Sequence, residues 1–574
     1  MRKYQNQIIV AILCLIFTTL FLFNTKSDFP WIFKKDLLAH DESSNSVVAA
    51  NLTRKLFPPM VRVNPLVDQE GNWMEGPYWQ HIPPLFAYVP YLFFNLDGQV
   101  SIEVKRLSYA FVLCPAGLLF ICGIYRFRQN LSAALAATIA AIFWLNTPFT
   151  HELISGYAFG ASDIVLAFTV VFGFLANLWY LEKDQELRLN YPIWKFALIG
   201  LVVALPVMAK NLLGAIPAAT FFGLLIWDHR TINKKVSASV LFFLFLLLVC
   251  LLPLFFSSPQ TFKSEIFVSF THFRQLEGWA RPWHWYLSDY LPQRYLFRWT
   301  WVYYAGITLG IVLSIKYKGE RKDKILLGLS GGWFVWNLLA ISLVTSKVPN
   351  FIYQSYLLSL FFILYALTIC VRQVAETFRF RKLWKSEDFR YIYVLALSIA
   401  LLVTGYESVR FDQAFKSRRA QAYIYQSEHE KFYRTAEEMR ALGLTTNDLI
   451  IVRVSDSDCW FRYYPLFLTG TESKTLLEMN FGFDPNAIKQ KYSRMFFVIN
   501  KTAPSPDVET HRFELTDYSM VEFDLSSFTS AQIQSIVRSL IDSHQADIQL
   551  DISRIKKDKT SCQWLVPDPI LNAP

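Results

Sequence analysis

The stretch Ile8–Glu42, "IIVAILCLIFTTLFLFNTKSDFPWIFKKDLLAHDE", joins a hydrophobic run to a pair of adjacent carboxylates. The run from Ile8 to Phe23 contains only apolar residues and two threonines. A helix crosses a bilayer with about 20 mostly apolar residues, because all its backbone groups are hydrogen-bonded internally. The run therefore predicts a first membrane-spanning helix, which is followed closely by Asp41 and Glu42.

The composition of the whole chain supports this interpretation. Of 574 residues, 53% are hydrophobic, 17% are aromatic and only 18% are charged. A soluble protein of this size usually carries more charge and less apolar surface. The formal net charge of +10 could indicate a nucleic-acid partner, but basic cytoplasmic loops give a membrane protein the same excess. The positions of the charges decide between the two.

About eleven segments have the length and composition of membrane spans, of which the fifth and the last are short. They run approximately over Ile8–Phe23, Leu107–Tyr125, Leu131–Phe149, Ile164–Leu181, Phe196–Ala209, Leu212–Trp227, Val236–Phe256, Trp299–Ile315, Ile325–Thr345, Phe351–Val371 and Tyr391–Thr404.

Basic residues gather in alternate loops between these segments. If the N-terminus is cytoplasmic, the same side receives Arg126 with Arg128 and the loops Asp228–Lys235, Lys316–Lys324 and Arg379–Lys385. The positive-inside rule assigns this side to the cytoplasm, and the nucleic-acid interpretation loses its support. No small-residue cleavage site follows the first run, which favours a retained helix over a cleaved signal peptide.

With this orientation, three long segments lie outside: residues 24–106, residues 257–298 and a C-terminal region of residues 405–574. Residues 1–404 then form a membrane domain, whose two outer loops hold most of the unusual residues. The apolar stretch Leu85–Leu96 in the first loop is too short to span, and it predicts a juxtamembrane helix in the interface.

The C-terminal region has the pattern of a soluble α/β domain. Helical spacing runs through Ser427–Leu444 and Ser530–Ile541, whereas Leu449–Val454 and Met495–Asn500 have the composition of buried strands. Its only cysteines are Cys459 and Cys562. An oxidising exterior would allow these two to form a disulfide, and no CxxC or HExxH pattern indicates a metal site.

Further polar residues recur at the outer ends of predicted spans. Asp163 begins the fourth span, Lys210 lies in the turn between the fifth and sixth, and Lys347 lies between the ninth and tenth. Arg274, Arg281 and His284 lie in the second outer loop. Each alone could be a solvated turn residue or a helix N-cap. Acidic and aromatic groupings of this kind are mostly missing from the inner loops, so the joint pattern favours a site at the outer face.

Carboxylates and cations at a membrane face suggest transfer of a group from a charged lipid. Lys and Arg would neutralise a lipid phosphate at the interface, and Arg would do so with a bidentate fork. A carboxylate could take a proton from an acceptor hydroxyl. Apolar juxtamembrane surface would accommodate the lipid tail.

Several of these motifs resemble those of a known family, both in their order along the chain and in the side of the membrane on which they lie. "HDESSNSVVAANL" (residues 40–52), "HIPPLFAYVPYLFF" (residues 81–94) and Lys105-Arg106 resemble the first outer loop of the GT-C glycosyltransferases, specifically the lipid A aminoarabinose transferase and protein O-mannosyltransferase group. "HFRQLEGWARPWHWYL" (residues 272–287) is similar to that group's aromatic and basic outer loop. The resemblance covers roughly Met1–Arg372. It implies a polytopic GT-C-like fold with about 11 transmembrane helices and a C-terminal domain.

The resemblance also implies roles for individual residues. Asp41 matches the group's catalytic acidic position, with Glu42 beside it, and Asp163 matches its second acidic position. Lys210, Arg274, Lys347 and Tyr353 match positions that handle the donor lipid phosphate. His81 is assigned to the same donor lipid-phosphate site, although it departs from the pattern: Ile82 separates it from the Pro-Pro pair that usually follows a Lys or His directly.

In this family a sugar leaves a polyprenyl-phosphate carrier and joins a lipid, glycan or protein hydroxyl on the outer face. Lipid A, another glycolipid, a polysaccharide of the cell envelope and a glycoprotein all remain open as acceptors. In a bacterium the protein would lie in the inner membrane with its site on the periplasmic side. Family members occur with and without metal ions, so the resemblance leaves a divalent cofactor open.

Two other classes of protein remain at this stage. A transporter or flippase for lipid-linked sugars would also be polytopic, but its ionisable groups should lie near mid-membrane. A noncatalytic membrane anchor for the C-terminal domain would not need polar groups clustered around the first outer loop. Replacement of Asp41 separates these alternatives from the enzyme.

Overall fold

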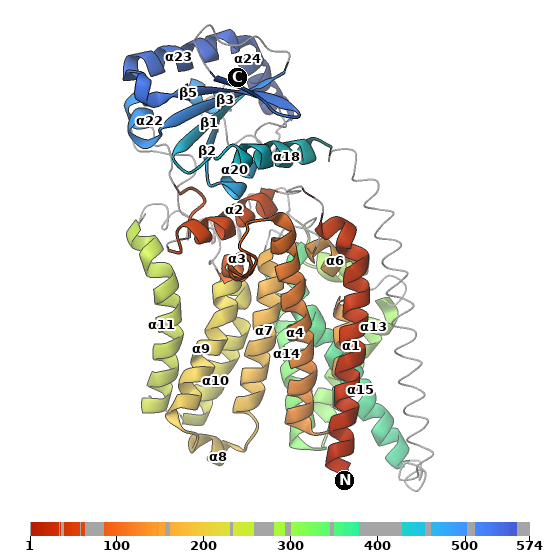
Figure 1. Ribbon diagram of the computed structural model, residues 1–574. Helices are drawn as coiled ribbons and strands as arrows, with labels where there is room; N and C mark the ends of the chain where they lie inside the picture. The colour runs from red at the N-terminus through yellow and green to blue at the C-terminus, as the bar shows by residue number, and fades with distance from the viewer. Residues whose placement is uncertain are drawn as a thin grey trace. The chain divides into compact units, whose positions relative to one another are not determined.

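A computed structural model describes residues 2–33, 35, 40–57, 59–63, 85–145, 147–154, 161–229, 233–257, 281–292, 300–344, 349–377, 427–453, 461–501 and 511–558. The chain forms two compact units, shown in Figure 1. The first comprises Met1–Ile32, Gln80–Phe86 and Arg106–Ala420, and the second comprises Phe33–Trp79, Ala87–Lys105 and Gln421–Pro574.

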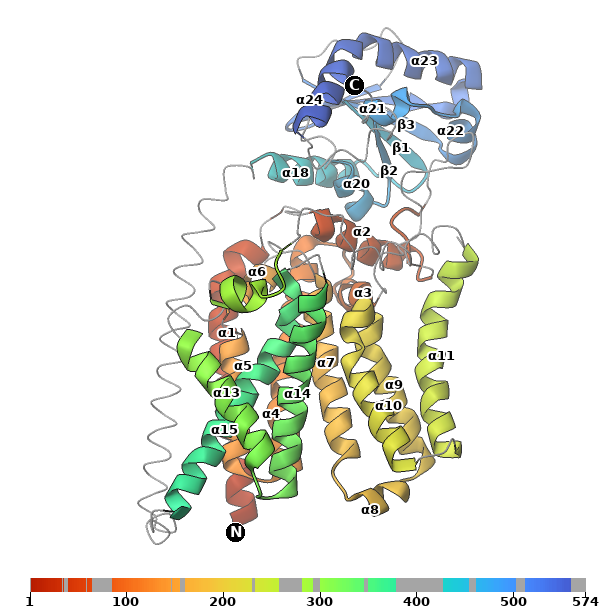
Figure 2. The ribbon, with the colours of Figure 1, turned by 180° about the vertical axis from the view of Figure 1, so that it is seen from behind.

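The first unit is a bundle of helices that run side by side in both ribbon views (Figures 1 and 2). Its helices are α1 (Arg2–Ile32), α4 (Ile102–Arg128), α5 (Leu131–Leu145), α6 (Pro148–Ile154), α7 (Ala161–Tyr180), α8 (Gln185–Leu189), α9 (Ile193–Lys210), α10 (Ile216–His229), α11 (Lys234–Ser257), α13 (Thr300–Lys316), α14 (Arg321–Leu343) and α15 (Tyr353–Thr377). Short turns η1 (Asn211–Gly214), η2 (Tyr286–Tyr290) and η5 (Pro349–Ile352) lie between them.

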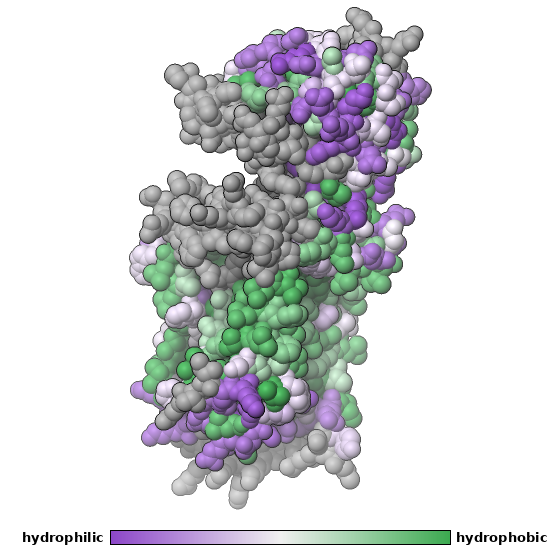
Figure 3. Space-filling model, turned by 90° about the vertical axis from the view of Figure 1, so that its left-hand side faces the viewer, coloured by the Kyte–Doolittle hydropathy of each residue, from purple (hydrophilic) through white to green (hydrophobic). Residues whose placement is uncertain are grey.

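The hydrophobicity of these helices confirms a polytopic membrane protein. Within the described residues, six helices are long and apolar enough to cross a membrane: Tyr4–Lys26, Ile102–Arg128, Ser162–Tyr180, Ile193–Lys210, Arg321–Leu343 and Tyr353–Gln373. Two shorter apolar helices, Leu131–Leu145 and Thr300–Lys316, also match predicted spans. Figure 3 shows hydrophobic surface on the bundle, bounded at its lower end by hydrophilic residues. The predicted total of about eleven is not confirmed, and the last predicted span, Tyr391–Thr404, lies outside the described residues.

Two buried aspartates tie helices together at the end of the bundle that contains α8. Asp323, at the start of α14, accepts hydrogen bonds from Tyr365 at 2.5 Å, Arg372 at 2.7 Å and Tyr317 at 2.8 Å, and Arg128 also donates to it. A buried carboxylate needs such partners, because an unpaired charge in the interior is strongly destabilising. The network therefore joins α4, α14 and α15.

The second aspartate, Asp228, lies at the end of α10. Arg188 of α8 binds both of its carboxylate oxygens at 2.7 Å, and Tyr180 of α7 donates to it at 2.7 Å. This bidentate geometry is the strongest arrangement available to an arginine and a carboxylate. The pair holds α7, α8 and α10 together at the same end as the basic loops.

We expect the basic loops to face the cytoplasm. An exposed residue between α13 and α14, Lys318, should become accessible to a membrane-impermeant thiol reagent as Lys318→Cys only after the cells are opened. Trp283, which is 70% exposed, lies in the second outer loop and should react as Trp283→Cys in intact cells. The chain without either substitution controls for its native cysteines. Labelling of residue 318 in intact cells would reverse the orientation.

The second unit contains a mixed sheet covered by helices. In its described part, five strands have the order β2 (Glu472–Thr475), β1 (Asp448–Val452), β3 (Arg494–Asn500), β5 (Tyr518–Asp524) and β4 (His511–Glu514). The first three are parallel, and β5 and β4 are antiparallel to their neighbours. The helices are α18 (Ser427–Ala441), α20 (Tyr463–Leu468), α21 (Leu476–Asn480), α22 (Pro485–Lys491), α23 (Ser530–Ser543) and α24 (Gln545–Asp558), with the turn η7 (Leu525–Ser527).

The core of this unit explains its order of elements. All five residues of β1 are buried, as expected for a central strand with helices on both faces. Leu449 and Met495 pack with Val537 of α23 in one hydrophobic cluster. In Figure 1, α23 and α24 cover one face of the sheet and α18 and α20 lie on the other. The predicted C-terminal α/β fold is confirmed.

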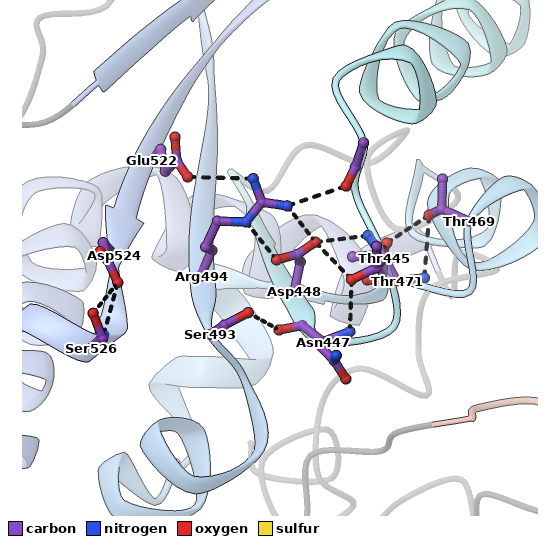
Figure 4. A network of polar contacts seen from close by, with 11 residues as sticks. Thr445, Asn447, Asp448, Thr469, Thr471, Ser493, Arg494, Glu522, Asp524 and Ser526 are labelled. Carbon is purple, nitrogen blue, oxygen red and sulfur yellow. Dashed lines mark hydrogen bonds and ion pairs between the residues drawn. The ribbon is translucent and has the colours of Figure 1, made fainter.

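An ion-pair network fixes the register of the central strands (Figure 4). Arg494 at the start of β3 binds both oxygens of Asp448 at 2.9 Å and lies 3.5 Å from Glu522 of β5. Asp448 also accepts a hydrogen bond from the backbone N–H of Thr445 at 2.7 Å. These contacts connect three adjacent strands at one end of the sheet.

The compact unit around the sheet includes more of the chain than residues 405–574. Residues 33–79 and 87–105, which were predicted to lie in the first outer loop, belong to it with helix α2 (His40–Arg54) and most of α3 (Leu85–Asp97). The helix predicted over Leu85–Leu96 is present as α3. Helix α2 packs against α20. The partition of the structure therefore does not follow a single cut in the sequence.

Candidate functional site

A buried ion pair joins two of the predicted site residues. The Nζ of Lys210 lies 2.5 Å from Oδ1 of Asp163, whose side chain is fully buried, and the Lys210 side chain is 13% exposed. Asp163 lies in the first turn of α7, and Lys210 is the last residue of α9. Both residues lie at the end of the bundle opposite α8, because α7 and α9 run antiparallel and are joined through it (Figure 2).

The turn after α9 determines where Lys210 lies. The chain enters η1 directly after Lys210 and folds back onto α9 so closely that a Cβ on Gly214 would lie 1.9 Å from the carbonyl oxygen of Pro206. No side chain is compatible with this approach. Lys210 also lies over the ring of Phe351, 5.4 Å from its centroid. Its ammonium group is thus held between a carboxylate and an aromatic face.

Tyr353, the first residue of α15, lies near the same pair. It is completely buried, its hydroxyl is 2.9 Å from the hydroxyl of Thr150, and its ring stacks on Trp144 with centroids 5.5 Å apart. Phe351, two residues before Tyr353, supplies the ring over which the Lys210 ammonium group lies. Burial, with smaller contributions from Tyr290 and Asp163, raises the pKa of Tyr286 in the turn η2.

The structure thus brings Asp163, Lys210 and Tyr353 together out of the predicted set. Asp41 and Glu42 lie in the first turn of α2, but their side chains are not described. His81, Arg274, Lys347, Cys459 and Cys562 lie outside the described residues, so their predicted roles and the predicted disulfide stay predictions. Among the residues described, no group of three or more His, Cys, Asp or Glu side chains is arranged to hold a metal ion.

Sequence reasoning missed the residues that surround the ion pair. Trp144, Thr150, Tyr286 and Phe351 were not named as site residues, although Tyr286 falls inside the quoted aromatic and basic loop. Buried aromatics are common in any membrane bundle, so only their contacts distinguish them. The useful signal was the concentration of Thr and aromatic residues at outer helix ends.

Helix α2, which carries Asp41, is attached to the sheet through its other end. Arg54, the last residue of α2, donates to the carbonyl oxygen of Phe467 at 3.0 Å, at the end of α20, and to Asn51 at 2.7 Å. Asn51 in turn donates to the carbonyls of Met60 at 3.2 Å and Val61 at 2.9 Å. The position of α2 therefore depends on α20 and on the segment that follows α2.

The segment after α2 ends in a buried cluster of charges formed by Arg62, Arg462, Glu472, Lys474 and Glu478. Arg62 pairs with Glu472, and these two side chains are 2% and 1% exposed. Lys474 lies 3.5 Å from Glu472 and 3.3 Å from Glu478, and Arg462 lies 3.3 Å from Glu478. This charge cluster attaches residue 62 to strand β2 and helix α21.

The charge cluster shifts the protonation of its members. Burial, supported by the nearby Arg62, lowers the pKa of Lys474 to about 8 despite its two glutamate partners. Burial alone would raise the pKa of Glu478, but Lys474, Arg462 and Arg62 lower it to about 2. Glu478 therefore stays charged at neutral pH, and its charge is balanced by these three cations.

Comparisons with known proteins identify the fold. No protein-family model and no curated protein sequence matches this chain. Among solved structures, ArnT from Cupriavidus metallidurans in the apo state is 14% identical, with a TM-score of 0.54 over 89% of this chain and 98% of ArnT. The same protein bound to undecaprenyl phosphate is 14% identical, with a TM-score of 0.55 over 88% and 97% of the two chains.

A weaker match is the oligosaccharyltransferase from Archaeoglobus fulgidus in its apo form, at 14% identity and a TM-score of 0.48 over 87% of this chain and 70% of that one. The ArnT alignments cover nearly the full length of both proteins, and therefore include the helical bundle as well as the C-terminal α/β unit. The chain has the GT-C fold of the polytopic membrane glycosyltransferases.

Proposed function

We propose that this protein is an integral membrane glycosyltransferase that transfers a sugar from a polyprenyl-phosphate carrier to an acceptor on the outer face of the membrane. The observation that carries the proposal is the buried Asp163–Lys210 pair beside Tyr353, at the bundle end opposite the basic loops. The likeness to ArnT, which has been solved with undecaprenyl phosphate, supports a polyprenyl-phosphate donor. The acceptor would be the hydroxyl of a lipid, a glycan or a protein of the cell envelope.

The reaction explains the need for cations at this end. In the donor, the phosphate is a diester with one negative charge. When the bond between the anomeric carbon and the phosphate oxygen breaks, the leaving polyprenyl phosphate carries a charge of about −1.5 to −2 at neutral pH, as for other phosphate monoesters. Lys210, with Arg274 and Lys347, would stabilise this developing charge. Asp163 orients the Lys210 ammonium group before the donor binds.

The acceptor half of the reaction needs a base. The acceptor oxygen attacks the anomeric carbon and gives up its proton, and we assign that proton to Asp41. Glu42 would support it. The attack occurs on the side opposite the leaving phosphate, so the anomeric configuration inverts. Tyr353, fixed by Thr150 and Trp144, would line the donor site.

Replacement of Lys210 tests the assignment of the ion pair. Lys210→Met should reduce donor binding about tenfold to about 100-fold, because a charge-assisted hydrogen bond contributes about 1.5–3 kcal/mol. The measurement is binding of a purified polyprenyl-phosphate sugar to the full-length protein in detergent, followed by transfer to a cell-envelope extract. Lys234→Met is the matched control, because Lys234 is an exposed lysine at the opposite end of the bundle and lies outside the groove described below.

The double variant Lys210→Met/Asp163→Asn separates binding from folding. It removes both charges, so Asp163 is not left as an unpaired buried carboxylate. If the pair were only structural, the double variant would recover donor binding and transfer. We expect it to fold better than Lys210→Met and still to bind the donor poorly. If the protein moved lipid-linked sugar across a membrane and formed no transfer product, it would instead be a transporter for lipid-linked sugars.

A further inference from the structure

A groove at the opposite end of the bundle has the features of a second lipid site. It has a volume of about 490 Å³ and is formed by α4, α7 and α9. Its walls are almost entirely apolar, with Leu119 and Leu198 38% and 40% exposed. A soluble ligand would not reach apolar walls that face the hydrocarbon of a bilayer, so the occupant must come from the membrane itself.

Gly123 of α4 and Leu175 of α7 both line the groove. At Gly123, an added Cβ would lie 2.3 Å from the side chain of Leu175. A larger residue at position 123 would therefore have to displace the Leu175 side chain, which lines the groove. Its lining on α4 runs from Leu119 to Phe127, which is about 12 Å at 1.5 Å per residue. This length lies within one leaflet, whose hydrocarbon is about 15 Å thick.

Cations gather where the groove meets the membrane surface. Arg126 is exposed and lines the groove, and within the described part of the chain it takes part in no ion pair. The charges of Glu182, Lys183 and Arg126 all act on Lys195 of α9. Lys195 is buried against Tyr191, whereas Arg126 and Lys183 are exposed; with Glu182, which lines the groove beside Arg126, these two cations leave a net charge of +1 at this end. The mouth is therefore complementary to an anionic group.

Aromatic residues mark this level as the membrane interface. Trp194 is 57% exposed, and its ring lies 6.0 Å from that of Trp179, which lines the groove. Exposed tryptophans are typical of the headgroup region. The apolar groove thus extends into the hydrocarbon from a cationic mouth at headgroup depth.

We infer that this groove binds an anionic phospholipid of the leaflet at the α8 end, with an acyl chain along α4, α7 and α9 and the phosphate at Arg126. The site is distinct from the Asp163–Lys210 pair, which lies at the other end of the same helices. The inference does not depend on the proposed transfer reaction.

Native mass spectrometry of the full-length protein in detergent tests this inference. With phosphatidylglycerol and phosphatidylcholine supplied in equal amounts, the protein should retain phosphatidylglycerol at least about fivefold better, because each basic residue near a headgroup contributes about 1 kcal/mol. Arg126→Gln should remove about fivefold of this preference. Lys234→Gln, which changes an exposed lysine at the same bundle end outside the groove, should not alter it.

Two further experiments test whether the lipid occupies the groove itself. Leu198→Trp fills the apolar part and should lower retention of both lipids equally, with thermal unfolding as a check that the variant folds. Cys122 is exposed and lines the groove, so phosphatidylglycerol should slow its alkylation in the native protein and not in Arg126→Gln. This second readout does not depend on the folding of Leu198→Trp.

Several results would overturn the inference. Equal retention of the two lipids by the native protein would remove the role of the headgroup charge. An unchanged preference in Arg126→Gln would place the lipid elsewhere. Displacement of phosphatidylglycerol by soluble glycerol phosphate would indicate a site for free phosphate groups rather than for a lipid.

Discussion

Asp41→Asn is expected to reduce transfer turnover about 100-fold to about 10,000-fold, the usual contribution of a positioned general base. The carboxamide has the shape of the carboxylate, but it cannot accept the proton of the acceptor hydroxyl. Binding of the polyprenyl-phosphate sugar should remain close to that of the native protein, because the proposed base acts on the acceptor. Transfer to a cell-envelope extract and donor binding are measured separately on the purified full-length protein.

The matched control is Asp547→Asn. Asp547 also lies in the first turn of a helix, α24 of the same compact unit, and it pairs with Arg453 at 2.6 Å on the surface. Its replacement should leave turnover unchanged, since an exposed ion pair contributes little to stability. Glu42→Gln tests whether the neighbouring carboxylate supports Asp41, and a smaller loss is expected. Near-normal turnover of a well-folded Asp41→Asn protein would exclude the base role and leave the acidic pair a structural function.

Hydrophobicity was enough to predict the membrane bundle. A membrane helix must satisfy its backbone internally and must be apolar along its length, so each span leaves a signal in its own residues. Helix α9 illustrates the limit of this signal. Only Phe196–Ala209 was predicted, because Lys195 and Lys210 bound the apolar run, whereas the helix continues over Ile193–Lys210. The ammonium groups of both lysines have partners that lie far away in the sequence.

The pairing of site residues could be predicted only in part. Asp163 and Lys210 were assigned to the same face of the membrane from their positions along the chain. Successive spans cross the membrane in alternate directions, so the start of the fourth span and the end of the fifth lie on one side. Their direct contact depends on the packing of α7 on α9 and on the tight turn at Gly214, and neither leaves a periodic signal. The attachment of α2 to α20 was missed for the same reason, since Arg54 contacts carbonyl groups more than 400 residues away.

Strand β2 shows why the sequence predicted fewer strands in the C-terminal unit than the structure contains. Its sequence, "ESKT" (residues 472–475), has no hydrophobic residue, yet all four residues are buried. Charged residues are rarely buried without partners, so a sequence pattern of this kind normally indicates a loop. Here Arg62 supplies the partner for Glu472 from the first outer loop. A strand that depends on such a distant residue cannot be recognised from its own composition.

This dependence leads to a large expected effect on stability. Arg62→Met should lower the free energy of unfolding by about 3 kcal/mol, at the lower end of the range of about 3–5 kcal/mol for a broken buried pair. The lower end applies because Lys474, 3.5 Å from Glu472, still compensates part of the negative charge of this buried carboxylate after Arg62 is removed. The measurement is denaturant-induced unfolding of the full-length protein in detergent, followed by a signal from the C-terminal unit. Arg512→Met is the matched control, since Arg512 pairs with Glu514 at 2.6 Å in the same unit and these side chains are 30% and 57% exposed, against 2% and 1% for Arg62 and Glu472.

A double-variant cycle then separates the pair from its surroundings. Arg62→Met/Glu472→Gln removes both charges, and we expect it to be more stable than Arg62→Met, because no glutamate is left unpaired in the interior. Transfer activity should nevertheless fall in both variants. Asn51 binds the backbone at Met60 and Val61, so release of residue 62 from the charge cluster loosens the segment that holds α2. If Arg62→Met were as stable as Arg512→Met, the charge cluster would not be what attaches α2, and the position of Asp41 would have to depend on Arg54 and α20 alone.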